Sequence, residues 1–100
     1  MELLKPLSKS DFPALSVAYT ASAGNTATWQ AGPQGVVVWS DQACYVEVGE
    51  GAVATSASTP IPPFTPIPFA VPATVSAPWR VSALRVSTDG TIYCKPINKQ

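Results

Sequence analysis

The sequence contains no histidine, few charged residues and no long apolar run. Without histidine, neither a Ser-His-acid triad nor a Cys-His pair can form, and the commonest metal ligand in proteins is missing. The two cysteines, Cys44 and Cys94, are too far apart in the sequence for a zinc-site spacing. No stretch reaches the roughly 18 apolar residues that a membrane-spanning helix needs. We therefore expect no catalytic residue, no metal, no cofactor and no membrane partner.

Charged residues form 12% of the chain, well below the fraction typical of soluble domains. The six basic and six acidic residues cancel, so no long-range attraction to nucleic acid is expected. No charge occurs between Phe12 and Ser40, or between Gly51 and Trp79. Serine and threonine could solvate such a surface, but we favour burial against copies of the same chain or within a larger assembly.

The carboxylates Asp41, Glu47, Glu50 and Asp89 fall in or beside expected turns or on an outward strand face. A pair of them could still be the two acids of a sugar hydrolase, because the sequence does not fix their separation. Solvated surface acids are the simpler interpretation. We expect no enzyme.

The N-terminal stretch "MELLKPLSKSDF" lacks the apolar core and the small-residue cleavage site of a secretory signal. Synthesis and retention in a cytoplasm are therefore expected. Cysteines usually stay reduced in that compartment. This favours two buried thiols at Cys44 and Cys94 over a disulfide.

Residues 1–25 show no helical or strand period and are interpreted as an extended N-terminal arm. The arm is predicted to be disordered in the free protein and to become ordered on a partner surface. The partner-binding residues expected in the arm are Leu3, Leu4, Leu7, Phe12 and Leu15.

Residues 26–100 are predicted to form a β domain, because β-branched and aromatic residues alternate with glycine, proline, asparagine and aspartate. The expected fold is all-β, a small antiparallel β-sandwich or barrel-like domain. In "ACYVEV", the period of two places Cys44, Val46 and Val48 on an inward face, opposite Tyr45 and Glu47. The three tryptophans Trp29, Trp39 and Trp79 are interpreted as core residues, with a carbohydrate-binding groove as the alternative.

The stretch "VSALRVSTDGTIYC" predicts a β-hairpin. We favour the register that pairs Leu84 with Cys94, with Gly90 in a left-handed conformation, since it gives one apolar face. This register places Arg85 over the ring of Tyr93.

Residues 59–72 form a proline-rich segment, because seven of the eleven prolines lie between Pro60 and Pro78. Proline has no backbone amide to donate, so the segment cannot be a central strand. A rigid extended segment, packed on the sheets or on a neighbour, is favoured over a Pro-x-x-Pro ligand. Its expected partner-binding residues are Ile61, Phe64, Ile67 and Phe69.

The stretches "ACYVEVGEGAVATSASTPIP" and "RVSALRVSTDGTIYCKPI" together resemble small all-β virion proteins of tailed bacteriophages that decorate or cement a capsid. The resemblance covers roughly residues 36–97. It implies a structural protein located in the virion, bound to the major capsid protein or other virion proteins, and homo-oligomeric, with a trimer favoured. The alternatives are a head-to-tail connector or tail component, and, from another class, a carbohydrate-binding module or a Pro-x-x-Pro adaptor.

Overall fold

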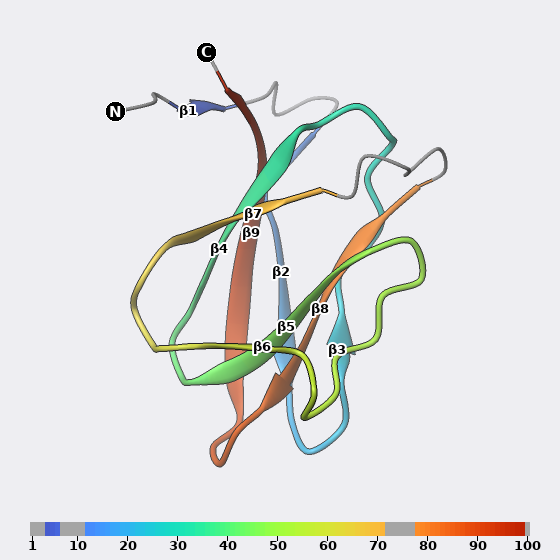
Figure 1. Ribbon diagram of the computed structural model, residues 1–100. Coiled ribbons are helices and arrows are strands. Elements are labelled where there is room, and N and C mark those ends of the chain that lie inside the picture. Colours follow the sequence, from blue (N-terminus) through green and yellow to red (C-terminus); the bar gives the residue numbers. More distant parts are fainter. Residues whose placement is uncertain (1–3, 7–11, 72–77, 100) are drawn as a thin grey trace.

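The computed structural model describes residues 4–6, 12–71 and 78–99, and the strands in these ranges form two antiparallel β-sheets (Figure 1). The sheets pack on each other through their inner faces, which is the arrangement of a β-sandwich. The all-β fold class expected from the sequence is confirmed.

The first sheet has five strands and is centred on the long strand β9 (Gly90–Lys99). One edge of β9 pairs with β4 (Gly35–Ser40), and β4 pairs in turn with β7 (Ile67–Ala70). The other edge of β9 pairs with β2 (Leu15–Tyr19) and, nearer the C-terminus, with β1 (Leu4–Pro6).

The second sheet has four strands in the order β3 (Gly24–Asn25), β8 (Arg80–Arg85), β5 (Cys44–Gly49) and β6 (Thr59–Ile61). Strands β8 and β5 are the two inner strands, because β8 pairs with β3 and β5, and β5 also pairs with β6.

The core lies between the sheets and is filled by alternate residues of the strands, together with a pair of tryptophans. Cys44 and Val46 are buried and Val48 is half-buried, as the period of two in this strand predicts. The core cluster consists of Tyr19, Trp29, Val36, Val38, Cys44, Val46, Ile61, Trp79, Val81, Ala83, Ile92 and Cys94.

The expected hairpin of residues 81–94 is wrong, because β8 and β9 belong to different sheets. The Asp89-Gly90 turn signal is local and does not decide whether the following strand folds back beside the previous one or crosses to the opposite sheet. Arg85 does not lie over Tyr93. Its Nη1 instead forms an exposed ion pair with Asp89 Oδ1, at 2.7 Å.

Position 90 requires glycine because there is no room for a side chain. The backbone of Gly90 does not have the left-handed conformation that we expected. A Cβ atom on Gly90 would lie 2.6 Å from the hydroxyl oxygen of Tyr19 and 2.6 Å from Asp41 Oδ1. The Tyr19 hydroxyl also donates to the Gln42 carbonyl at 2.9 Å and lies 2.5 Å from Ser40 Oγ. Glycine at this position therefore lets β9 begin directly against the buried tyrosine.

Residues 1–25 were expected to form a separate arm. This is wrong for most of the residues in this range that the structure describes. Residues 15–19 form a strand of the first sheet, and Tyr19 is a core residue. Two hydrogen bonds hold the chain just before this strand: Lys95 Nζ donates to the Phe12 carbonyl at 2.6 Å, and Trp29 Nε1 donates to the Pro13 carbonyl at 2.8 Å. The segment belongs to the β domain because its alternating apolar residues complete one side of the sandwich.

The proline-rich segment lies at the edges of the sheets, as expected from its missing amides. Strand β6 is the edge of the second sheet and β7 is the edge of the first, so residues 62–66 cross from one sheet to the other. The segment therefore packs on its own domain. Its prolines protect two sheet edges against further strand addition.

Both cysteines are buried free thiols, which confirms the expectation of reduced cysteines. Burial raises the pKa of Cys94 from 9.0 to about 12, and the neighbouring Cys44 raises it further. Burial also raises the pKa of Cys44, and that of Tyr19 to about 12.

These shifts predict that stability falls in alkali. The unfolded thiol ionises above its ordinary pKa of 9.0, whereas the folded Cys94 thiol stays neutral up to about 12, so unfolding becomes more favourable as the pH rises through this window. The midpoint of urea unfolding should fall between roughly pH 8 and pH 11. The urea midpoint of a Cys94→Val variant should fall less over this pH range, because only Cys44 and Tyr19 then contribute to the pH dependence. Equal slopes in the two proteins would contradict the assignment to Cys94.

Candidate functional site

The outer face of the first sheet carries side chains that alternate with the core residues of the same strands. Trp39 of β4 is the cross-strand partner of Tyr93 of β9, and Tyr93 is also the partner of Ser16 of β2. The next outward pair in the same two strands is Val37 and Lys95. Because Val38 and Cys94 point into the core, these neighbours must point outward.

Three aromatic side chains lie in a row on this face, and we call Trp39, Phe64 and Tyr93 the aromatic cluster. The rings of Trp39 and Tyr93 are stacked, with centroids 4.5 Å apart and an interplanar angle of 17°. Phe64 flanks Trp39 with centroids 6.4 Å apart. The exposed fractions are 36% for Trp39, 69% for Phe64 and 39% for Tyr93. Large apolar surface thus remains in contact with water.

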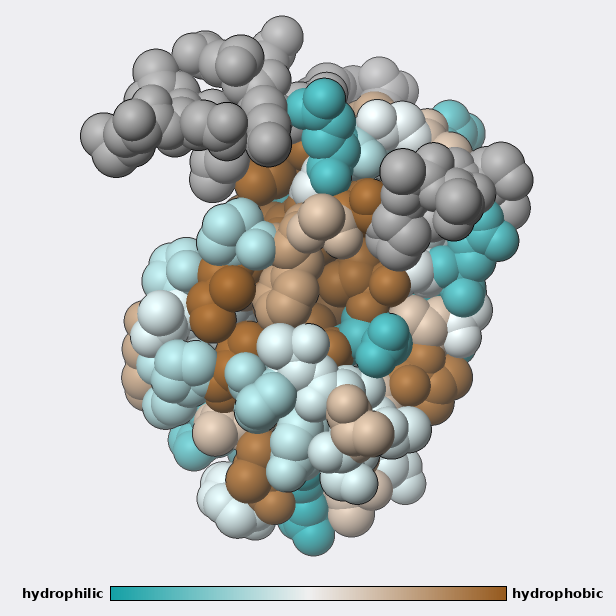
Figure 2. All heavy atoms as spheres, in the orientation of Figure 1, coloured by the Kyte–Doolittle hydropathy of each residue, from teal (hydrophilic) through white to brown (hydrophobic). Residues whose placement is uncertain are grey.

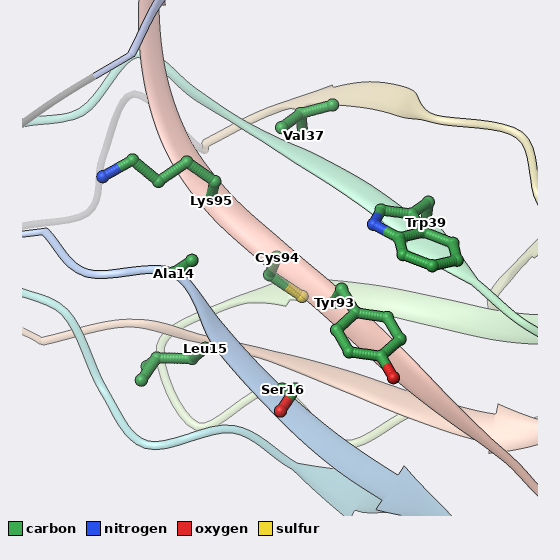
Figure 3. Close-up of a pocket in the computed structure, with 8 residues that line it drawn as sticks. All are labelled: Ala14, Leu15, Ser16, Val37, Trp39, Tyr93, Cys94 and Lys95. Atoms are coloured by element: carbon green, nitrogen blue, oxygen red, sulfur yellow. The ribbon is translucent and has the colours of Figure 1, made fainter. Parts of the chain in front are cut away.

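A hollow of about 230 Å³ lies beside the stacked rings, over β2, β9 and β4 (Figure 3). Figure 3 shows Trp39 and Tyr93 side by side, with Ser16 across from Tyr93 and the Lys95 side chain leading away from the rings. The lining is mainly apolar. It consists of Ala14, Leu15, Ser16, Val37, Trp39, Tyr93, Cys94 and Lys95.

Lys95 is the charged residue of the hollow's lining, and its ammonium group is already engaged. It donates to the Phe12 carbonyl at 2.6 Å. The carbonyl is neutral, so the ammonium group keeps its positive charge at one end of the hollow.

Phe64 is held at the surface by a strained turn between β6 and β7. Its φ is 57°, in the left-handed region where glycine is the usual residue. Pro63 precedes it, as in a type II turn, whose third position normally requires glycine or asparagine. The Phe64 amide donates to the Ser40 carbonyl at 2.7 Å, which ties the turn to the end of β4. The turn therefore presents a large apolar ring where a glycine would be unstrained.

Trp39 and Phe64 both lie in stretches of the sequence without a charged residue, 12–40 and 51–79. Figure 2 shows one face of the molecule, over which strongly hydrophilic residues are few and apolar residues reach the surface between weakly polar ones. Exposed apolar area of this kind, when gathered in one place, marks contact surfaces.

The structure does not gather on one surface those of the nine predicted partner-binding residues whose side chains it describes. Ile61 is a core residue, and Phe12, Leu15, Ile67 and Phe69 are partly buried against the core. Leu3 and Leu7 lie outside the described residues, and Leu4 is described only as part of β1. Phe64 is the member of this set that is exposed in the described part of the chain. Leu15, Ile61, Ile67 and Phe69 contribute to stability, because the edge strands that carry them are integral to the sandwich.

Trp39 and Tyr93 were not among the predicted site residues, although the sequence contains part of the signal. In "GVVVWS", inward Val36 and Val38 place Trp39 outward by the period of two. The pairing of Trp39 with Tyr93 is not visible in the sequence, because the two residues lie in strands far apart along the chain.

The groove of three tryptophans, considered as a carbohydrate site, is not formed. Trp29 and Trp79 are buried and pack on each other in the core, with centroids 4.8 Å apart. Only Trp39 of the three is exposed.

Asp41 and Glu47 form hydrogen bonds within the domain. Asp41 accepts the amide of Thr91 at 2.8 Å, and Glu47 accepts the hydroxyl of Ser58 at 2.9 Å. Within the described ranges, no group of three or more cysteine, aspartate or glutamate residues is placed to hold a metal ion. A helix long and apolar enough to span a membrane is likewise not found in those ranges.

No known protein family, curated protein or solved structure matches the chain. Function is therefore inferred from the chain's own residues and their geometry.

Proposed function

We propose that this protein is a non-enzymatic structural component of a bacteriophage virion that acts through protein–protein contacts. The position we favour is that of a capsid decoration or cement protein bound to the major capsid protein, present in many copies and oligomeric. A head-to-tail connector or tail component is the alternative within the same class. The resemblance of residues 36–97 to such proteins supports the proposal.

The structural observation that carries the proposal is the aromatic cluster. Tryptophan and tyrosine are enriched among residues that dominate binding energy at protein interfaces. Here Trp39 and Tyr93 lie on a rigid sheet, next to a mainly apolar hollow, so little order has to be gained on binding.

Two functions of another class receive less support from the geometry. A Pro-x-x-Pro ligand adopts the polyproline II conformation, with φ near −75°. Phe64, between Pro63 and Pro66, instead has a φ of 57°. A sugar site combines a ring face with several polar groups, whereas the lining of the hollow is mainly apolar.

A sedimentation experiment tests the proposal. Purified full-length protein is mixed with preformed empty capsids of the phage that encodes it, and the pellet is assayed for bound protein. We expect saturable addition to the capsids, reduced in a Trp39→Ser variant and retained in a Val53→Ser variant, since Val53 is exposed but is not part of the cluster. The absence of addition by the unaltered protein to capsids and to isolated tails would overturn the proposal.

A further inference from the structure

The row of rings and the hollow form a surface that is complementary to itself. Phe64 projects on one side of Trp39, and Trp39 also lines the hollow. A projecting ring and a recess thus lie next to each other on one face. In a two-fold dimer the same patch of both copies meets, so the projecting ring of each copy can enter the recess of the other.

The size of the hollow suits a phenyl ring. Protein cavities of about 150 Å³ lined by apolar groups accept benzene. The hollow measures about 230 Å³ and is open to the surface, so it can receive the Phe64 ring together with part of the adjoining turn.

The charges favour a second copy as the occupant. The segment that carries Phe64 has no charged residue between Gly51 and Trp79, and the ammonium group of Lys95 in the hollow already binds the Phe12 carbonyl. The turn that enters the hollow therefore brings no charge of its own toward Lys95 of the other copy, where a like charge would weaken the interface.

The strained backbone of Phe64 is a further observation that marks this surface as a binding site. A non-glycine residue in the left-handed region costs of order 1 kcal/mol or more, and strain of this kind concentrates at functional sites. The Phe64 ring is 69% exposed, so in a single chain most of its surface makes no packing contact that could offset the strain.

We propose that the aromatic cluster binds a second copy of the same chain about a two-fold axis, with Phe64 of each copy seated in the hollow of the other. This inference rests on the proposed function only in treating the cluster as a protein contact surface. It names the partner and the mode of contact, and its dimer differs from the trimer implied by the resemblance.

The test uses the full chain and two variants that disrupt the contact from opposite sides. Phe64→Gly removes the projecting ring and relieves the strained backbone, whereas Ser16→Arg places a long charged side chain in the hollow. Val53→Ser is the control for loss of an exposed apolar side chain elsewhere. Sedimentation equilibrium across micromolar concentrations gives the association constant, and thermal unfolding at a concentration where each protein is monomeric gives its melting temperature.

We expect the unaltered protein and Val53→Ser to show a monomer–dimer equilibrium, and both cluster variants to dimerise about tenfold or more weakly. The melting temperature of monomeric Phe64→Gly should equal or exceed that of the unaltered monomer. If Phe64 served only to stabilise the fold, the substitution would lower the melting temperature. A monomeric or trimeric unaltered protein, or a dimer that both variants retain, overturns the inference.

The capsid experiment separates this inference from the proposed function. A protein that is monomeric, yet adds to capsids through Trp39, leaves the proposed function in place with capsid protein as the occupant of the cluster. A dimer that fails to add to any virion component leaves the dimer in place and removes the proposed function.

Discussion

Deletion of residues 1–25 is expected to leave the chain unfolded. The deletion removes β1, β2 and β3 and exposes one edge of β9. It also takes away Tyr19, which is buried in the core and donates a hydrogen bond to the Gln42 carbonyl. Loss of one large buried aromatic side chain costs about 3–5 kcal/mol. A domain of this size has about 5–15 kcal/mol of stability in total, and the lost strand pairing adds to the deficit.

Circular dichroism and urea titration of the truncated chain provide the measurement. Deletion of residues 1–3 is the control, since it removes no residue of the described strands. A cooperative transition of the longer deletion near the midpoint of the full chain would show that the first 25 residues are dispensable, as the sequence alone had led us to expect.

A Trp79→Ala substitution is expected to be the most destabilising of the tryptophan-to-alanine changes. Trp79 is fully buried, packs on Trp29, and donates from Nε1 to the Gln30 carbonyl at 3.0 Å. The two tryptophans also exchange backbone hydrogen bonds of 2.9 Å in both directions. The substitution therefore leaves a large cavity and an unbonded carbonyl, at a cost of about 3–5 kcal/mol or more.

Trp39→Ala is the matched comparison, because it removes the same side chain from the surface. Its cost should be about 1 kcal/mol or less, which corresponds to at most about 4–8 °C in a domain of this length. Thermal unfolding of the two variants decides the matter. Equal losses would mean that the burial of Trp79 is misassigned.

The features that the sequence predicted correctly follow from rules that act within one strand. The alternation of Cys44, Val46 and Val48 and the exclusion of the proline-rich segment from a central strand need no knowledge of neighbouring strands. The same alternation was present in Leu15, Val17 and Tyr19. It was overlooked because the strand is short and irregular sequence surrounds it.

The features that could not be predicted depend on which strands become neighbours. The Asp89-Gly90 turn is compatible with a hairpin and with a crossing between sheets, and long-range pairing decides between the two. The aromatic cluster depends on the same choice, because Trp39 and Tyr93 become partners only when β9 pairs with β4. Phe64 was expected to bind a partner as part of an extended segment, but the turn that exposes it is not evident from its sequence.

The strand order also has a consequence for the timing of folding during synthesis. Strand β9 of the first sheet and the inner strand β8 of the second are the last two named strands to leave the ribosome. Until residues 80–99 emerge, the pairings available among the named strands are β4 with β7 and β5 with β6. Strands β1, β2 and β3 remain unpaired until then, because their partners β8 and β9 are synthesised last. The nascent chain therefore stays exposed to wrong pairing until translation nears its end, and a ribosome stalled before residue 80 holds a chain that cannot complete either sheet.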